Sequence, residues 1–372
     1  MEKSSYVLIG IIILFVISLI VAVVVFNYKG TSLSPVSALE ECKSLSYSSP
    51  NALNLLFFSD KETAEKYSNY LLTISPYKEN SKAFNFYYID SYTPSCELYQ
   101  SIALLCYSKS LIAKAASCPH DYIIAFQSKS GEIRSSSYMS VLSLNTAHPL
   151  SVFPHELGHA LGFLAEEYVP AAIPSKAENC VSSCALFNNQ SDGCFEGCSK
   201  SEFKRSIDLG FMRSLNADSY GKFDEEILSN RLPKIETSKT TGSVISNPND
   251  CQNNKFYLVK AVYNSTEDKI KILNKELVQG CPGTNGFGDF NYSIILEDNS
   301  IALQDSFNPV LIFTDSQSES QETISGDVFE SQKPFYLSIP QIEKAKSLQI
   351  QNNDHVIGEI KLNDLGSRPC RI

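Results

Sequence analysis

The fourteen residues from His155 to Tyr168 constrain the fold and chemistry of this chain more than any other stretch. His155 and His159 are one helical turn apart, so on a helix both imidazoles leave the same face as close neighbours. Two neutral imidazoles at this spacing form half of a tetrahedral zinc site, and Glu156 stands beside them where it can take a proton from a water at the metal. The spacing therefore predicts a zinc site with Glu156 as the catalytic base.

The acidic pair Glu166 and Glu167 is expected to complete this site, but only if the helix ends first. A helix that continued at about 1.5 Å per residue would carry Glu166 roughly 16 Å beyond His155, whereas a zinc–oxygen bond is about 2 Å long. Gly162 falls on the metal-facing side, where a glycine can end the helix. We therefore predict a break near Gly162 that brings Glu166 or Glu167 back to the metal.

Other interpretations of the same residues remain open. A helix with two buried, hydrogen-bonded histidines and a solvated acidic pair is one, but the combination of base, glycine and acidic pair favours zinc. A thermolysin-like enzyme would take its third ligand from a second helix, where Asp224, Glu225 and Glu226 stand. A catalytically silent surface adhesion or structural protein with a peptidase-like fold is the third.

The stretch resembles the zinc metallopeptidases of the IgA-peptidase type, a metzincin-like family with the pattern H-E-x-G-H, then L-x-D-E-Y. The matching residues are His155–His159, Leu164 and Glu166–Tyr168, with Glu166 in place of the family's aspartate. Alignment with the third metal ligand of metzincins points to Glu166 rather than Glu167. The resemblance, strongest over about residues 50–230, implies hydrolysis of protein or peptide substrates with Zn²⁺ as the cofactor.

Two further roles come from this resemblance. Met212 is one of only three methionines and is similar in position to the Met-turn, which places a methionine beneath the metal. Tyr168 is expected to support the ligand loop. In metzincins, an edge strand binds the substrate as an added strand, and backbone pairing would provide the affinity.

An uncharged, mostly apolar run from Val7 to Phe26 has the roughly 20 residues that a membrane-spanning helix needs. It is longer than the apolar region of a cleaved signal peptide, about 7–15 residues, so we expect a single-pass membrane anchor. Eleven cysteines and three N-x-S/T sequons, at Asn189, Asn264 and Asn291, favour an extracellular location for the rest of the chain. The net charge of −10 argues against nucleic acid as a partner.

The expected organisation combines an α/β metzincin-like catalytic domain with an all-β, immunoglobulin-like sandwich. In chain order the parts are a short tail 1–6, an anchor 7–26, a stalk 27–48, the catalytic domain 49–232, a linker 233–254 and the sandwich 255–372. Four cysteines, Cys180, Cys184, Cys194 and Cys198, form either two disulfides, which an extracellular location favours, or a small structural zinc site.

Hydrophobic periodicity predicts the elements of both domains. In the catalytic domain we expect strands at 53–58, 83–89 and 121–126, helical structure at 97–117, and a half-exposed edge strand at 138–144. Short strands without helical stretches follow from residue 255, and Val310–Phe313 is one of those assigned to the sandwich.

Overall fold

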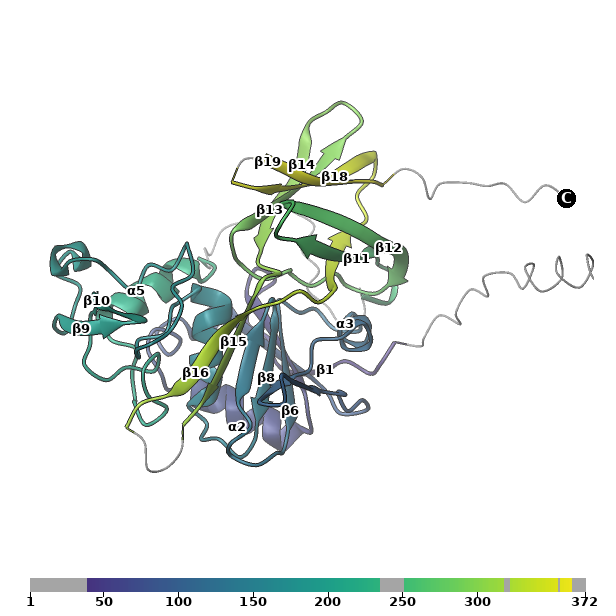
Figure 1. The fold of residues 1–372 in the computed structure, drawn as a ribbon. Helices are drawn as coiled ribbons and strands as arrows, with labels where there is room; N and C mark the ends of the chain where they lie inside the picture. The colour runs from purple at the N-terminus through teal and green to yellow at the C-terminus, as the bar shows by residue number, and fades with distance from the viewer. Residues whose placement is uncertain (1–38, 235–250, 318–321, 354, 363–372) are drawn as a thin grey trace, which may run out of the picture. The chain divides into compact units, whose positions relative to one another are not determined.

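The computed structural model describes residues 39–234, 251–317, 322–353 and 355–362, which form a β-rich fold with few helices (Figure 1). The expected membrane anchor at 7–26 lies outside the described residues. Among the residues that are described, no helix is long and apolar enough to cross a membrane.

The largest sheet has eight strands in the order β1-β3-β2-β6-β8-β7-β15-β16. Its four central strands are parallel, and β1, β7, β15 and β16 run antiparallel to their neighbours. Their bounds are β1 Lys43–Ser46, β2 Leu53–Phe58, β3 Phe84–Ile89, β6 Tyr122–Gln127, β7 Ser135–Tyr138, β8 Val141–Asn145, β15 Leu311–Ser316 and β16 Ser325–Glu330. Continuous apolar runs form the central strands because helices and loops cover both faces of the sheet.

Helix α2 (Lys61–Leu71) packs against this sheet. Asp60 caps it by accepting a hydrogen bond from the backbone N–H of Thr63 at 2.8 Å. Its buried side chains, Tyr67 and Leu71 among them, join a core cluster that also contains the helix carrying His155. Helix α2 therefore packs in the same core as the helix that carries the candidate site and helps to hold that helix in place.

Two predictions for the catalytic range need correction: the helical structure at 97–117 is confirmed only for its second half, and the strand at 138–144 is not a half-exposed edge. Residues 97–117 form strands β4 (Glu97–Tyr99) and β5 (Ala103–Leu105) before helix α3 (Lys109–Ala115). A disulfide between Cys96 and Cys106 closes this hairpin, whereas a helix at about 1.5 Å per residue would hold these cysteines about 15 Å apart. Residues 138–144 are divided between β7 and β8, which are buried because β15 covers the open edge of β7.

The C-terminal part contains two antiparallel sheets, ordered β12-β11-β17 and β14-β13-β18-β19, that share one hydrophobic core. Their bounds are β11 Lys255–Asn264, β12 Lys269–Gln279, β13 Phe290–Leu296, β14 Ile301–Phe307, β17 Phe335–Pro340, β18 Ala345–Asn352 and β19 His355–Lys361. Val310–Phe313, which we assigned to the sandwich, overlaps β15 in the eight-stranded sheet instead. Strand pairing thus crosses the expected boundary at residue 255.

Ten cysteines form five disulfides: Cys42–Cys118, Cys96–Cys106, Cys180–Cys198, Cys184–Cys194 and Cys251–Cys281. The prediction of disulfides is confirmed, including the two that connect the four cysteines after the acidic pair. The eleventh, Cys370, lies outside the described residues.

His120 is buried before β6, at the contact with residues 281–284. Its Nδ1 lies 2.9 Å from the carbonyl oxygen of Cys118, and a Cβ on Gly283 would come within 2.3 Å of its Nε2. Burial lowers the pKa of His120 from 6.5 to about 4. The folded protein therefore holds this imidazole neutral at pH values where an unfolded chain would protonate it.

Acidification should consequently destabilise the protein through His120. As the pH falls from 6.5 to 4, the unfolded state binds the proton first, and stability should decrease by up to about 3 kcal/mol. Burial raises the pKa of Asp121 to about 6, which acts in the opposite direction, so the effect is measured as a difference. Urea unfolding at pH 6.5 and 4.5 should show a smaller loss for His120→Gln than for the wild type; equal losses would contradict the assignment.

Candidate metal centre

Both histidines project from one short helix that changes its form at the site. Helix α4 (Val152–Leu157) continues directly into a π-helical turn, η2 (Gly158–Gly162), and the chain leaves the helix at Phe163 with a left-handed φ of 54°. The predicted break near Gly162 is therefore observed, although the left-handed residue is the one after it. Gly162 serves close packing, because a Cβ there would lie 2.7 Å from Leu228.

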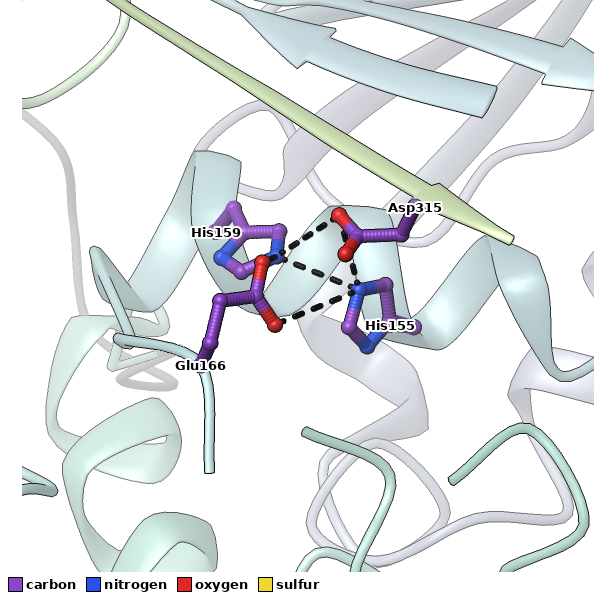
Figure 2. Close-up of side chains that lie close together, drawn as sticks. All are labelled: His155, His159, Glu166 and Asp315. Carbon is purple, nitrogen blue, oxygen red and sulfur yellow. Dashed lines mark hydrogen bonds and ion pairs between the residues drawn. The ribbon is translucent and has the colours of Figure 1, made fainter. Parts of the chain in front are cut away.

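Four buried side chains converge at the end of this helix: His155, His159, Glu166 and Asp315 (Figure 2). The Nε2 atoms of the histidines are 3.2 Å apart. The Oε1 atom of Glu166 lies 3.0 Å from Nε2 of His159. The Oδ2 atom of Asp315 lies 3.2 Å from Nε2 of His155 and 3.6 Å from Nε2 of His159. The structure thus brings three predicted residues together with a fourth, Asp315, that the sequence analysis did not identify.

The backbone fixes the orientation of both imidazoles. Nδ1 of His155 lies 2.8 Å from the carbonyl oxygen of Phe211, and Nδ1 of His159 lies 2.7 Å from that of Leu164. A carbonyl oxygen only accepts hydrogen bonds, so each Nδ1 carries a hydrogen. The two Nε2 atoms then face each other, an arrangement that is stabilised by a positive charge between them, either a metal ion or a proton on one ring.

The distances between donor atoms fit a small tetrahedral ion. Ligand atoms about 2.0 Å from zinc at tetrahedral angles are about 3.3 Å apart. The contacts of the histidine Nε2 atoms with each other and with the carboxylates range from 3.0 to 3.9 Å, and all four donors lie within 4.8 Å of one another. Both carboxylate oxygens of Glu166 and Oδ2 of Asp315 are buried without a conventional hydrogen-bond donor among the described residues. The chemistry of the donors, two imidazoles and two carboxylates, is also that of zinc sites.

The electrostatics of the cluster favour a positive charge at its centre. Burial lowers the pKa of His159, but the carboxylates of Glu166 and Asp315 outweigh burial and raise this pKa well above its usual range. Burial acts to raise the pKa of Asp315, but His155 and His159 hold it well below the usual range. Burial and the Asp315 charge raise the pKa of Glu156, whose oxygens also have no hydrogen-bond donor in the described part of the chain.

Glu167, the other candidate ligand, lies outside the group of four donors. It is fully buried, and its titration is linked to that of Asp224 on helix α5 (Lys222–Arg231). Burial raises the pKa of Glu167 to about 8, against the opposing charges of Arg205 and Arg213. Asp224, considered as a distant third ligand, lies outside the group of four donors. The two adjacent glutamates therefore have different environments, and Glu166 alone faces the histidines.

Met212 and Tyr168 both lie close to the donors. Met212 is fully buried beneath the histidine helix, where its Sδ would be 2.8 Å from a Cβ on Gly158, and its carbonyl accepts from the N–H of Glu167 at 2.9 Å. The hydroxyl of Tyr168 donates to Oδ1 of Asp315 at 3.1 Å. Both residues are thus placed where they can orient the ligand-bearing segments.

Asp315 reaches the cluster from β15, far along the chain from the histidines. Nothing in the sequence around Asp315 resembles a metal-binding motif, since the acid follows a short apolar run without a nearby histidine or cysteine. Only the pairing of β15 with β7 brings it to the site. Comparison with models of known protein families and with curated proteins finds no match to this sequence.

Proposed function

We propose that this chain is a membrane-anchored zinc metallopeptidase of the IgA-peptidase type. Its fold would combine a metzincin-like catalytic domain, an immunoglobulin-like sandwich and an N-terminal transmembrane helix at residues 7–26. The observation that carries the proposal is the pair of imidazoles whose Nε2 atoms face each other 3.2 Å apart, with the Glu166 carboxylate beside them. This arrangement favours a positive charge, and its imidazoles and carboxylate are ligands that zinc commonly takes.

A zinc ion held by these residues would act as a Lewis acid toward the scissile carbonyl and would make a water more acidic. Glu156 lies next to His155, outside the group of metal donors, with both carboxylate oxygens free of hydrogen bonds from the described residues. Its carboxylate can accept a proton from the attacking water and return it to the leaving amine. Phe211 and Leu164 would hold the histidines in the tautomer that presents Nε2 to the metal.

We place the catalytic part outside the cell. The N-terminal helix would contact the bilayer, and proteins or peptides would be the substrates. Five disulfides support this location, because structural disulfides persist mainly in oxidising compartments. An acidic chain of net charge −10 fits a protein or peptide partner better than nucleic acid.

Glu166→Gln and Glu167→Gln form a matched pair that tests the metal site. Glu166→Gln replaces an anionic donor by a neutral amide and should weaken zinc binding by at least the roughly 10–100-fold expected for disturbed metal-site partners. Because burial raises the pKa of Glu167 to about 8, glutamine resembles its protonated form and should leave zinc binding nearly unchanged. Competition with a chromogenic chelator measures both affinities.

Equal zinc affinities in the two variants would contradict the assignment of Glu166. Absence of zinc binding by the wild type would remove the basis of the proposed function. A second candidate function, a silent binding protein with a structural zinc ion, is favoured by one observation: four protein donors are present, as in closed structural sites. Peptide hydrolysis by the wild type or by a variant of Asp315 would favour the peptidase, and its absence in all of them would favour the silent binding protein.

A further inference from the structure

Strand β15 lies between β7 and β16 in the eight-stranded sheet and carries Asp315 to the histidines. Its residues 313–315 pair antiparallel with residues 135–137 of β7. Without β15, β7 would be the open edge of this sheet, since β8 lies on its other side. An extended peptide binds to such an edge by adding a strand. The chain's own β15 has the position and direction that an antiparallel bound peptide would take.

The side chains of β15 also fill the space next to the metal donors. Phe313 stacks on the ring of His159, with centroids 4.2 Å apart and planes at 14°, and it contacts Phe163 edge-on. The cavity that remains between these residues and Met139 of the β7–β8 turn has a volume of only about 10 Å³, no more than one water requires. Phe313 therefore occupies an apolar pocket that could otherwise take a side chain of a peptide.

Asp315 closes the donor cluster itself. Hydrolytic zinc sites use three protein ligands and keep one position open, whereas four protein ligands are typical of closed sites. The Asp315 carboxylate is fully buried and lies within 3.6 Å of both Nε2 atoms. The hydroxyl of Tyr168 holds its other oxygen. This fourth donor leaves no open corner in the cluster.

The hairpin is attached to the catalytic sheet partly through solvent-accessible contacts. Arg134 forms an ion pair with Asp327 at 2.5 Å, although the Asp327 side chain is 56% exposed. The N–H of Ile324 donates to the carbonyl of Arg213 at 2.8 Å, and the Ile324 side chain is buried in the core below. Exposed ion pairs contribute little stability, so the main cost of moving the hairpin from β7 is the loss of the buried contacts of Phe313 and Asp315. A bound peptide that fills the same positions would offset this cost.

We propose that the β15–β16 hairpin is an internal occupant of the peptide-binding groove and keeps the site latent. When it is displaced, an extended peptide adds to β7, with a large apolar or aromatic side chain in the pocket of Phe313. This inference rests on the proposed function, because it assigns the substrate groove and the regulation of the same metal site.

Asp315→Ala provides the central test, because the proposal predicts opposite changes in two measured quantities. Loss of a metal donor should weaken zinc binding about tenfold or more. Hydrolysis of casein and fluorogenic peptides at saturating zinc should increase at least about tenfold, because the state in which the hairpin occupies the groove and Asp315 fills the fourth metal position is no longer the dominant one. A merely structural role for Asp315 would lower both quantities. Asp315→Asn, which keeps the side-chain shape, should change both in the same directions by smaller factors.

Glu330→Gln is the matched control. It changes an exposed carboxyl group on β16 of the same hairpin, and both quantities should remain at their wild-type values. Equal hydrolysis by the wild type and both Asp315 variants would overturn the latency proposal while leaving the proposed function intact. Zinc binding without hydrolysis in any form would instead overturn the proposed function, and the latency proposal with it.

A binding measurement tests the groove independently of turnover. The probe is a fluorescent peptide with the sequence of residues 310–316, and the protein carries Glu156→Gln with Asp315→Ala so that it cannot cleave the probe. This peptide should bind at least about tenfold more tightly than one with alanine in place of Phe313, as expected for burial of a phenyl side chain. It should bind the Glu156→Gln single variant at least about tenfold more weakly, because the hairpin competes. Equal affinities in either comparison would contradict the proposal.

Discussion

Replacement of Glu156 by glutamine should abolish most peptide hydrolysis without removing the metal. The carboxylate is not one of the four donors, and no donor among the described residues satisfies its oxygens. Burial raises its pKa well above the usual range for a glutamate, and Asp315 and Glu166 contribute further. A glutamine of the same size cannot accept the proton from water, so the turnover number should fall by about 10²–10⁴-fold, the usual contribution of a general base.

The comparison is best made in the Asp315→Ala background, in which we expect the hairpin not to limit the rate. Turnover of a fluorogenic peptide gives the activity, and elemental analysis gives the zinc content of the same samples. Glu225→Gln is a suitable control, because this carboxyl group lies on α5 outside the donor cluster. Retained hydrolysis in Glu156→Gln would exclude Glu156 as the base, and loss of zinc would show that it supports the ligands instead.

Local spacing was sufficient to predict the core of the candidate site. His155 and His159 are related by one helical turn, and this relation depends on helix geometry alone. The need for a break before Glu166 follows from the same geometry. The choice between Glu166 and Glu167 could not be made from the residues alone, because it depends on the conformation after Phe163 and on distant contacts. One such contact is the hydrogen bond from Glu167 to the carbonyl of Met212.

Asp315 could not be predicted because it reaches the site through a non-local strand pairing. The apolar residues of Val310–Phe313 predicted a strand, but an apolar run does not reveal which sheet a strand joins. A similar limit explains why helical structure was wrong for the first half of residues 97–117: apolar residues such as Leu98 and Leu105 fit a helical period, yet the Cys96–Cys106 disulfide closes a hairpin. A distant strand pairing decided the first case, and a short hairpin closed by a disulfide decided the second.

The disulfide Cys180–Cys198 should support both stability and the metal site. Cys180 and Cys198 pack with Ala165, directly before the proposed ligand Glu166. The hydroxyl of the neighbouring Ser199 donates to the carbonyl of Glu166 at 2.7 Å. The disulfide closes a loop over a sequence separation of 18 residues, for which the chain-entropy relation gives about 3 kcal/mol of stabilisation.

Removing this bridge by Cys180→Ala with Cys198→Ala should therefore lower the free energy of unfolding by about 3 kcal/mol. It should also weaken zinc binding about tenfold or more, because the loop that presents Glu166 is no longer held. Cys184→Ala with Cys194→Ala is the matched comparison: its separation of 10 residues predicts a loss of almost the same size, about 2.7 kcal/mol. Neither cysteine of that bridge belongs to the cluster in which Cys180 and Cys198 pack with Ala165, so zinc affinity should be unchanged.

Urea unfolding of the zinc-free proteins gives the stabilities, and chelator competition on the folded proteins gives the zinc affinities. A general loss of stability would reduce zinc binding equally in both double variants, since the two lose similar amounts of the free energy of unfolding. A selective loss in the Cys180 and Cys198 variant requires that the bridge act on the position of Glu166. Equal zinc affinities in the two variants would mean that Ser199 and the surrounding packing hold the ligand loop without the disulfide.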